Sequence, residues 1–413
     1  MTSPFILTPE TSPEPEEPAQ YKSLYQATAQ KRKRSWPIVG VEGTVKPGAL
    51  RAVWENDWKP ACKKGSHPFQ DGRLEDFEPI FDDLIEAHVD DPTSPEYTLA
   101  FLSRAQELSL EAEDALGRGD RGLASELYLR ACAVLRIARL PHSQEKDCSV
   151  KQRAWQFQKS LYLKAGKLWH SPLEEVIIPH IHDINTNDDD DQQHVHHSES
   201  GARGRVERPR IPLYVRLPLE TRDFGRTCPA VLIVSDDRTA HTRLCGEALR
   251  RGWGCVVAEV PGAGDCPVSA EEGEEDAAGG LWSSVLDWMK AMRMFDMDRL
   301  VAWGPGEAVV RLAGTHGDRF GGCVAVLGDD GEGDLPMLDD VVSCSLLLVV
   351  ADGEGSVEPE GFRRPVDDGH GLDEGDNDLA LFKYGAPSTS VAQYPRAGTR
   401  AVYDWVGKAF DSK

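Results

Sequence analysis

One short stretch in the C-terminal half of the chain has the layout of a mount for a catalytic nucleophile. Residues 299–320 read RLVAWGPGEAVVRLAGTHGDRF, a buried-strand pattern that turns through glycine and proline into a helix. A nucleophile on such a tight strand-to-helix turn needs small residues on either side of it. Gly304 and Gly306 meet that need, but Gly306 and Glu307 stand where a serine would be required. The stretch therefore predicts the strand-to-helix turn of a catalytic nucleophile, but no nucleophilic side chain stands in it.

A second candidate centre lies in PGAGDCP, directly after the strand pattern at residues 254–260. The thiolate of Cys266 would be chemically a better nucleophile than a serine hydroxyl, because it needs less help from a base. Asp265 beside it could serve as a relocated acid or base. We favour the alternative, a structural turn in which Asp265 fixes the geometry of the loop.

A serine and two histidines are weaker candidates. Ser235 ends a strand pattern and could be a displaced nucleophile with His241 as its partner, but a strand-end hydroxyl bonded to the backbone is the simpler interpretation. His241 begins a helix pattern and could equally be a solvent-facing cap residue. Helix packing or C-capping explains His316, in AGTHGDRF, more simply than catalysis does.

Five histidines accompany a run of aspartates in HIHDINTNDDDDQQHVHHSESGARGRVER, namely His180, His182, His194, His196 and His197. Imidazole and carboxylate are usual ligands of divalent metals, so the group could hold one. The surrounding Asn, Gln and Ser residues are typical of a flexible surface loop instead. We expect a flexible acidic loop at residues 183–208, with no metal and no other cofactor.

The elements that would position these residues follow an α/β pattern after residue 210. Apolar, β-branched runs predict strands at residues 211–218, 229–235, 254–260, 299–304, 321–328 and 345–350. Helical spacing predicts helices at residues 243–252, 281–295, 306–317 and 398–410. Such an alternation predicts a largely parallel sheet covered on both faces. Reactive groups sit at the carboxyl ends of its strands, so WGPGEA, VPGAGDCP and VVADGEG should share one rim.

The segment before this sheet is helical. Helical spacing begins at Tyr97 and is broken by GRGDRG at residues 117–122. A second helix runs to Leu140, where Pro141 ends it, and a third is predicted at residues 151–170. Three helices alone make a small core, but they can cover another domain.

The chain resembles the fungal yellowish-green pigment hydrolases in the order of its segments. These are LYLRACAVLRIARLPHS, RAWQFQKSLYLKAGKLW, EVIIPHIH, IPLYVRLP, RRGWGCVVAEVPGAGDCP, LWSSVLDWM and VVRLAGTHGDRFGG. Residues 53–85 also resemble the N-terminal segment of that family, so the resemblance spans residues 53–405. The family consists of α/β-hydrolases that shorten polyketide chains on the way to naphthalene-type pigments. It is related to bacterial fermentation-respiration switch proteins and to carbon-carbon hydrolases of nicotine breakdown.

The resemblance implies an α/β-hydrolase fold, with a largely parallel, doubly wound sheet and an N-terminal helical lid domain. We expect the lid at residues 46–172 and the hydrolase core at residues 173–413. The family uses a serine, an aspartate and a histidine for acyl or retro-Claisen chemistry. Its Gly-Leu-Asp-Gly-Tyr-Arg oxyanion turn corresponds here to SDDRTAHT, and two adjacent aspartates are unfavourable beside a developing oxyanion.

The catalytic motifs of the family are degenerate in this chain. Its Gly-x-Ser-x-Gly-Gly elbow is shortened around Gly304, Gly306 and Glu307, and no serine falls in the interval. The elbow therefore retains small residues without a nucleophile.

The acid and the base of the family are also unmatched. The acid position falls on Gly355, and Asp352 and Glu354 could substitute only if the loop is re-routed; the histidine position falls near Val391. His370 is the last histidine in the chain and lies in a Gly- and Asp-rich loop well before that position. Asp265 and Cys266 remain as fallback candidates.

Composition limits the partners that this protein can have. Its 413 residues carry a formal charge of −23, with 69 acidic against 46 basic side chains, which disfavours nucleic acid and anionic membranes. No apolar run approaches the roughly 20 residues of a membrane span, and the N-terminus lacks the layout of a secretory signal. Nine cysteines without CxxC pairs predict reduced thiols. We expect a cytoplasmic protein.

The N-terminal residues are rich in Pro, Glu, Ser and Thr, a composition that predicts a disordered tail at residues 1–45. The tail contains KRKR at residues 31–34. Four basic residues could form a nuclear-import signal, but a solvated charge run is the simpler interpretation.

Three functional hypotheses follow. The first is a diverged member of a fungal polyketide or pigment pathway that binds an aromatic polyketide or a partner enzyme without cleaving it. Loss of a triad nucleophile or histidine typically lowers the rate by about 10⁴- to 10⁶-fold. The second is an active hydrolase that uses Asp265, Cys266 or Asp352, and the third is a scaffold whose acidic surface recruits a basic partner. The sequence is also compatible with a homodimer.

Overall fold

The computed structural model describes residues 48–140, 148–182, 208–269, 275–326, 344–352, 379–385 and 399–411. The predicted tail at residues 1–45 lies outside these residues, as does the predicted acidic loop except for residue 208.

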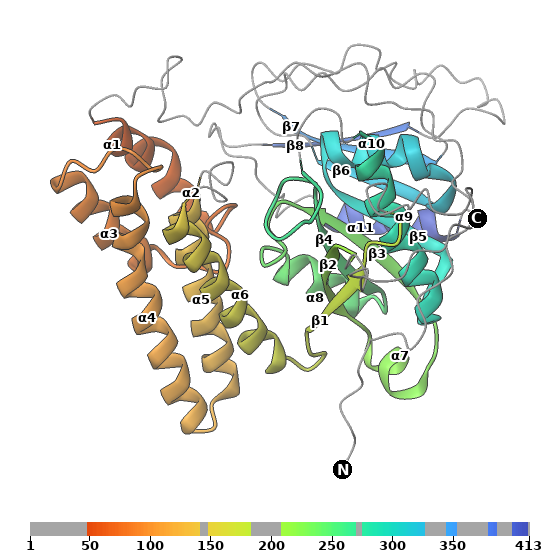
Figure 1. Cartoon of the computed structure of the whole chain (residues 1–413), viewed down its shortest axis with the longest axis horizontal. Coiled ribbons are helices and arrows are strands. Elements are labelled where there is room, and N and C mark those ends of the chain that lie inside the picture. The colour runs from red at the N-terminus through yellow and green to blue at the C-terminus, as the bar shows by residue number, and fades with distance from the viewer. Residues whose placement is uncertain are drawn as a thin grey trace, which may run out of the picture.

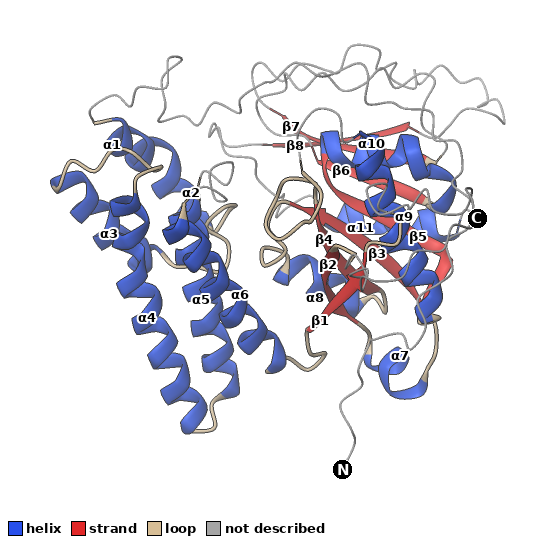
Figure 2. Ribbon diagram, viewed as in Figure 1, coloured by secondary structure: helices blue, strands red, loops and turns tan. Residues whose placement is uncertain are grey.

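An eight-stranded sheet forms the centre of the C-terminal part of the chain, in the order β1-β2-β4-β3-β5-β6-β7-β8 (Figure 2). Every strand except β2 runs in the same direction, because β2 pairs antiparallel with both of its neighbours and the remaining pairs are parallel. The strands are β1 (Glu174–Pro179), β2 (Arg210–Arg216), β3 (Cys228–Ser235), β4 (Gly254–Glu259), β5 (Phe295–Pro305), β6 (Gly322–Val326), β7 (Ser345–Asp352) and β8 (Leu379–Gly385). The predicted largely parallel sheet is confirmed.

Apolar side chains on both faces of the strands explain why the sheet is buried. Val231, Ile233 and their neighbours in register belong to one core, whereas Leu232 and Val234 belong to a second core on the other face. This alternation follows from the two-residue period of a strand. Neither β1 nor β8 was among the predicted strands, and these two form the edges of the sheet.

Helices cover the two faces of the sheet, as predicted. α8 (Thr242–Arg250) and α11 (Thr399–Asp411) pack into the core on one face, and α9 (Glu275–Met292) and α10 (Gly306–His316) pack into the core on the other. The short helix α7 (Leu219–Phe224) joins β2 to β3.

The N-terminal residues form a helical unit beside the sheet (Figure 1). Its elements are α1 (Ala49–Val53), η2 (Trp54–Trp58), α2 (Lys59–Lys64), α3 (Leu74–Glu86), α4 (Pro95–Gly117), α5 (Arg121–Arg139) and α6 (Ser149–Lys167). Ser94 and Asp120 cap α4 and α5 by accepting hydrogen bonds from the backbone N–H groups of Tyr97 and Leu123. We call residues 49–167 the helical unit.

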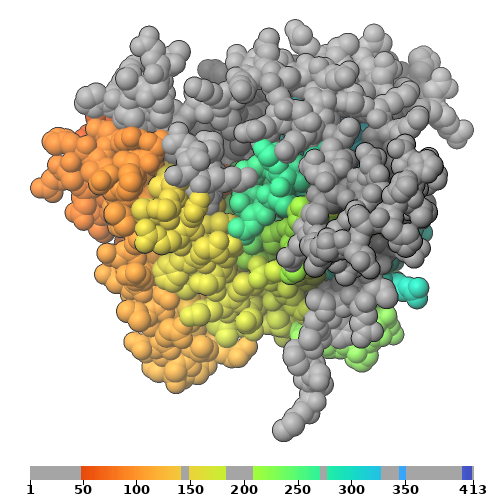
Figure 3. All heavy atoms as spheres, in the orientation of Figure 1, coloured from red at the N-terminus to blue at the C-terminus, as the bar shows by residue number. Residues whose placement is uncertain are grey.

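The helical unit packs directly against the sheet region, as the yellow atoms of α6 against the green atoms show in Figure 3. One continuous core contains side chains of α5 and α6 together with residues of β2, β3 and β4. Tyr162 of α6 stacks on Tyr214 of β2, with ring centroids 5.6 Å apart. The predicted boundary at residues 172 and 173 falls between α6 and β1, and the division into two domains stays a prediction.

Among the described residues, no helix has both the length and the apolar character that crossing a membrane requires.

Candidate functional site

The turn from β5 into α10 is an ordinary helix start. Pro305 is the N-cap, with φ −58° and ψ 139°, and none of the described residues from Trp303 to Ala308 has a positive φ. A nucleophile elbow is a sharp, strained turn that lifts one side chain above the sheet. The backbone here passes from strand to helix without such a residue.

The predicted elbow residues have structural partners. A Cβ added to Gly304 would lie 2.4 Å from the carbonyl oxygen of Val234, so glycine allows β5 to lie close to β3. Gly306 is buried as the first residue of α10. The Glu307 side chain is 66% exposed and forms an i,i+4 ion pair with Arg311, at 2.7 Å. None of the three is placed to attack a substrate.

The predicted acid and base positions fall at or beyond the ends of described segments. Asp352 is the last residue of β7, at the carboxyl end of the strand, and its register partner is Gly385 of β8. Gly355, Val391 and His370 lie outside the described residues.

Ser235 and His241 are brought together at the end of β3. The Oγ atom of Ser235 lies 2.6 Å from Nε2 of His241, and both side chains are at least 97% buried. His241 occupies the N-cap position of α8 as suggested, but the suggestion that it faces solvent was wrong, because the ring is buried, and it makes no capping hydrogen bond. Ser235 also has the expected backbone contacts: its Oγ accepts from the N–H of Asp237 and donates to the carbonyl of Asp237, at 3.0 and 2.9 Å.

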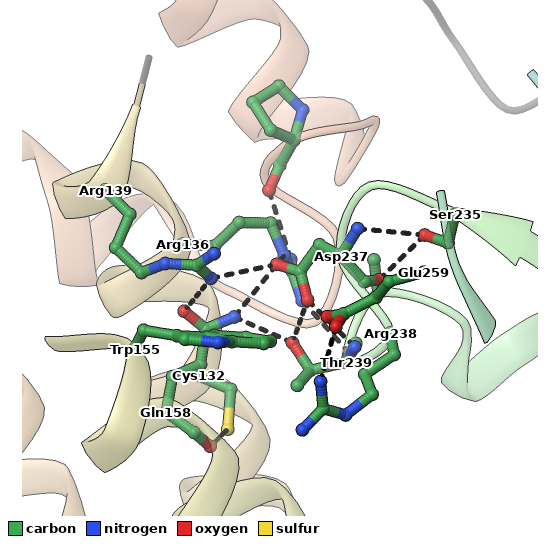
Figure 4. A network of polar contacts seen from close by, with 12 residues as sticks. Cys132, Arg136, Arg139, Trp155, Gln158, Ser235, Asp237, Arg238, Thr239 and Glu259 are labelled. Atoms are coloured by element: carbon green, nitrogen blue, oxygen red, sulfur yellow. Dashed lines mark hydrogen bonds and ion pairs between the residues drawn. The ribbon is translucent and has the colours of Figure 1, made fainter. Parts of the chain in front are cut away.

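The turn between β3 and α8 reaches into the helical unit (Figure 4). Oδ2 of Asp237 accepts hydrogen bonds from Arg139 at 3.3 Å and from Gln158 at 3.0 Å, and it lies 3.4 Å from Nε of Arg136. Thr239 donates to Oδ1 of the same carboxylate through both its N–H and its hydroxyl. We call Asp237, Arg136, Arg139 and Gln158 the clamp, because they connect the sheet turn to α5 and α6.

Arg136 extends the clamp to the loop between α2 and α3. Its guanidinium donates to the carbonyls of Pro68 at 3.1 Å, Gln70 at 3.0 Å and Thr239 at 3.3 Å. Arg136 and Arg139 are fully buried, and a buried charge is tolerated only when it is paired and hydrogen-bonded. The helical unit and the sheet are therefore held together by polar contacts as well as by their shared core.

A second charged group lies beside the clamp. Arg238 is 1% exposed and pairs with Glu259 and with Asp265, each at 2.6 Å. Asp265 also accepts from Nε1 of Trp155 at 3.0 Å and from Nζ of Lys159 at 2.6 Å, both on α6. The backbone N–H of Asp265 donates to Glu259 at 2.8 Å. Asp265 thus fixes its loop against α6, in agreement with the structural interpretation that we favoured.

Burial and charge set the titration of these groups. Burial raises the pKa of Glu259 to about 7, although Arg238 opposes the change. Burial alone would raise the pKa of Asp265 as well, but Arg238 and Lys159 lower it overall. Burial lowers the pKa of His241 to about 4, so this histidine is neutral at physiological pH.

The remaining candidates lie away from this turn or beneath it. Cys266 is 6% exposed, and its sulfur belongs to the core on the α9 side of the sheet. His316 lies between α9 and α10, where Nε2 is 2.9 Å from Oγ of Ser283, and helix packing explains it as expected.

Two of the five histidines next to the aspartate run lie in the described part of the chain. Nδ1 of His180 is 3.1 Å from Oγ of Ser284, and Nε2 of His182 is 2.8 Å from Asp287, so both pack on α9. Within the described segments, no three His, Cys, Asp or Glu side chains are grouped so as to hold a metal ion. His194, His196 and His197 lie outside those segments.

The carboxyl ends of the strands form one rim as predicted, but polar groups at this rim are engaged in structural contacts. The carboxyl ends of β4, β3, β5 and β7 lie at one edge, and Ser235 is the register partner of Glu259. Two backbone N–H groups of the β3–α8 turn, those of Asp237 and Thr239, already donate to side chains of the turn. An oxyanion hole needs such donors free and aimed at the substrate oxygen.

Sequence reasoning missed the clamp. Arg136, Arg139 and Gln158 lie in helix patterns where arginine and glutamine read as surface residues. One signal was available: Arg136 and Arg139 stand within the apolar run of α5, on a helix whose last turns are entirely buried. A charged residue in such a run indicates a buried partner.

Comparison with known proteins identifies the fold class. No protein-family model matches the chain, and no curated protein matches it. Among solved structures, 2,6-dihydroxy-pseudo-oxynicotine hydrolase is similar at 17% identity over 76% of this chain and 88% of that chain, with a TM-score of 0.50. An S-formylglutathione hydrolase from Agrobacterium tumefaciens matches 49% of this chain and 90% of its own, at 15% identity and a TM-score of 0.34. A cold-adapted esterase from an Arctic intertidal metagenomic library matches 48% of this chain and 88% of its own, at 16% identity and a TM-score of 0.35.

The chain has the α/β-hydrolase fold. Its strand order, its largely parallel sheet with helices on both faces, and its likeness to the oxynicotine hydrolase agree on this class. At this level of identity the likeness defines the fold alone.

Proposed function

We propose that this chain is a member of the α/β-hydrolase class that binds a small molecule without hydrolysing it. The observation that carries the proposal is the turn from β5 to α10. No serine, threonine or cysteine lies between Gly304 and Arg311, and the backbone there lacks the strained residue of an elbow. A hydrolase of this fold has its nucleophile at that turn.

The β3–α8 turn gives independent support. Asp237 and Arg238 fill the space between the turn and α6 with paired charges, and the turn's own side chains use the N–H groups of Asp237 and Thr239. A substrate carbonyl bound here would have to displace these contacts. The turn is built to hold the helical unit in place.

The ligand that we propose is an aromatic polyketide of fungal pigment biosynthesis. This proposal rests on the resemblance between the segments at residues 53–405 and the polyketide-shortening hydrolases of yellowish-green pigment formation. A hydrolase of 2,6-dihydroxy-pseudo-oxynicotine has a similar fold, and carbon-carbon hydrolases of nicotine breakdown are relatives of the same pigment enzymes.

Turnover and binding assays on the purified full chain test the proposal. The protein is offered p-nitrophenyl esters and an acylated naphthopyrone, with an active α/β-hydrolase as the positive control. We expect hydrolysis no faster than in buffer, and binding of the naphthopyrone by isothermal titration calorimetry. Hydrolysis within about 10²-fold of the control would contradict the proposal, because triad loss costs about 10⁴ to 10⁶ in rate.

One observation favours a second candidate, weak hydrolysis by Ser235. Its Oγ lies 2.6 Å from Nε2 of His241, and a neutral imidazole at that distance can act as a general base. A hydroxyl has one proton, however, and the hydroxyl of Ser235 also lies within hydrogen-bonding distance of the carbonyl of Asp237. Activation requires that the proton be shared with His241 instead.

Single substitutions separate the two candidates. If any turnover is found, Ser235→Ala and His241→Gln should each remove it when Ser235 is the nucleophile. Cys266→Ala and Glu307→Gln are matched controls and should leave it unchanged. Turnover that survives Ser235→Ala would rule out the second candidate.

A further inference from the structure

Two cysteine thiols face each other across the neighbouring strands β6 and β7. The Sγ atoms of Cys323 and Cys344 are 3.5 Å apart, which is van der Waals contact between sulfur atoms. Neither cysteine is in a disulfide in this structure. From this geometry we propose that Cys323 and Cys344 are a redox-sensitive pair that a peroxide converts to a disulfide between the two strands.

The register of the strands keeps the two thiols on the same face of the sheet. Cys323 is the register partner of Leu346, and Cys344 lies two residues before Leu346, so the two-residue period turns both side chains the same way. Both belong to the core on the α9 side of the sheet, together with Leu346 and Leu348. The register therefore places both side chains in the same core, where their sulfur atoms are in contact.

The distance is short enough for bond formation. A disulfide has an S–S length of about 2.05 Å, so the sulfur atoms must approach by about 1.5 Å.

The two thiols differ in access, and this difference assigns their roles. Cys344 stands directly before β7 and is 7% exposed, whereas Cys323 lies within β6 and is 0% exposed. Cys344 is the thiol that a peroxide reaches first, and Cys323 is the thiol that resolves the product.

The chemistry proceeds in two balanced steps. The sulfur of Cys344 attacks one peroxide oxygen and the O–O bond breaks, which gives a sulfenic acid and, with hydrogen peroxide as the oxidant, one water. The sulfur of Cys323 then attacks the sulfenic sulfur. The S–O bond breaks, the S–S bond forms, and the hydroxyl leaves with the thiol proton as a second water. Both thiols are oxidised to a disulfide, and the peroxide is reduced to two waters.

This site is separate from the proposed binding function. β6 begins at Gly322 and β7 at Ser345, so the pair lies near the amino ends of its strands, opposite the rim that holds the clamp. Oxidation would join β6 to β7 at that edge. Because a cross-link constrains the unfolded chain, the oxidised protein should resist denaturant better than the reduced protein.

Thiol counting and peptide mapping on the full chain test the proposal. The reduced protein is treated with hydrogen peroxide, denatured, and alkylated with N-ethylmaleimide. We expect the nine thiols of the chain to fall by two, a non-reduced digest to contain the Cys323–Cys344 cross-link, and dithiothreitol to restore all nine. A cross-link found only between other cysteines, or no loss of thiols, would overturn the proposal.

Matched variants make the assignment specific. In Cys323→Ser and in Cys344→Ser, peroxide should not lower the number of thiols by two. Cys62→Ser, at a buried cysteine of the helical unit, is the control, and in it peroxide should still remove two thiols. Loss of two thiols from Cys323→Ser as well would contradict the pairing. If a serine variant fails to fold, the cross-link map of the unmodified chain still decides the outcome.

Discussion

At the scale of single residues, Asp237 is a buried carboxylate with partners on two helices of the helical unit. One of its carboxylate oxygens contacts Arg139, Arg136 and Gln158, while the other accepts two bonds from Thr239. The carboxylate is 1% exposed. Two buried guanidinium groups lie against this carboxylate, and this makes it a sensitive test of the clamp.

Substitution of Asp237 by alanine should be strongly destabilising. The change leaves Arg136 and Arg139 buried without their carboxylate, and removing one partner of a buried ion pair typically costs about 3 to 5 kcal/mol. The free energy of unfolding in urea measures the effect. Glu307→Ala breaks a surface ion pair and is the control, for which a far smaller change is expected. Equal effects of the two substitutions would contradict the role of the clamp.

Two glycines give a matched pair of predictions. Gly304→Ala should destabilise the protein by about 1 to 3 kcal/mol, because its Cβ would lie 2.4 Å from the carbonyl oxygen of Val234 on β3. Gly246 lies within α8 with nothing within 4 Å of an added Cβ, so Gly246→Ala should stabilise the helix by about 0.5 to 1 kcal/mol. In thermal unfolding, the melting temperature should fall for Gly304→Ala and rise for Gly246→Ala. A neutral Gly304→Ala would mean that β5 and β3 can separate.

At the scale of elements, a buried histidine at the start of α8 and another at the end of α10 should make stability depend on pH. Burial lowers the pKa of both His241 and His316 to about 4, against 6.5 for an exposed histidine. Above pH 6.5 neither state is protonated, so the full stability is present. As the pH falls from 6.5 to 4, the unfolded chain binds protons that the folded chain excludes. Each histidine then removes up to about 3 kcal/mol of stability.

Glu259 at the end of β4 acts in the opposite direction. Its pKa is about 7 in the folded chain and near 4.5 when exposed, so the folded state binds a proton first as the pH falls from 7 to 4.5. This gain offsets part of the loss from the two histidines. His316→Gln should therefore reduce the loss of stability between pH 6.5 and 4, and Glu259→Gln should increase it, as measured by urea unfolding at several pH values. The same loss in His316→Gln as in the unmodified protein would be evidence against the buried neutral ring.

The sequence predicted most of the elements but not all of their roles. β2 to β7 have continuous apolar runs, and α8 to α11 have helical spacing, so local pattern was sufficient for them. β1 and β8 lie at the edges of the sheet, where one side lacks a strand neighbour and the apolar signal is weaker. The absence of a serine between Gly304 and Arg311 could be read from the sequence directly, because the spacing of an elbow is local. The buried arginines of α5 indicate that a partner exists, but the sequence could not identify it as Asp237, which lies 98 positions from Arg139 in the chain.

At the scale of the whole molecule, the helical unit and the sheet share one core. The stacked pair of Tyr162 and Tyr214 lies at the contact between α6 and β2, and the clamp and the contacts of Asp265 lie along the same boundary. A cover that opened freely over an active site would expose these charges and this apolar surface together. The interface instead has the character of a permanent contact.

The helical unit and the sheet should therefore unfold together. Because one core and one polar network cross the boundary, we expect a single transition in urea that coincides when followed by tryptophan fluorescence and by far-UV circular dichroism. Asp237→Ala should separate the two signals. Two resolved transitions in the unmodified protein would show that the helical unit is held only weakly.

The loss of the nucleophile is the central claim, and labelling with a fluorophosphonate probe tests it most directly. The probe reacts covalently with activated serines, so the full chain should remain unlabelled under conditions in which an active α/β-hydrolase is labelled completely. Intact mass spectrometry before and after incubation gives the result. Stoichiometric labelling of any serine, Ser235 above all, would contradict the account.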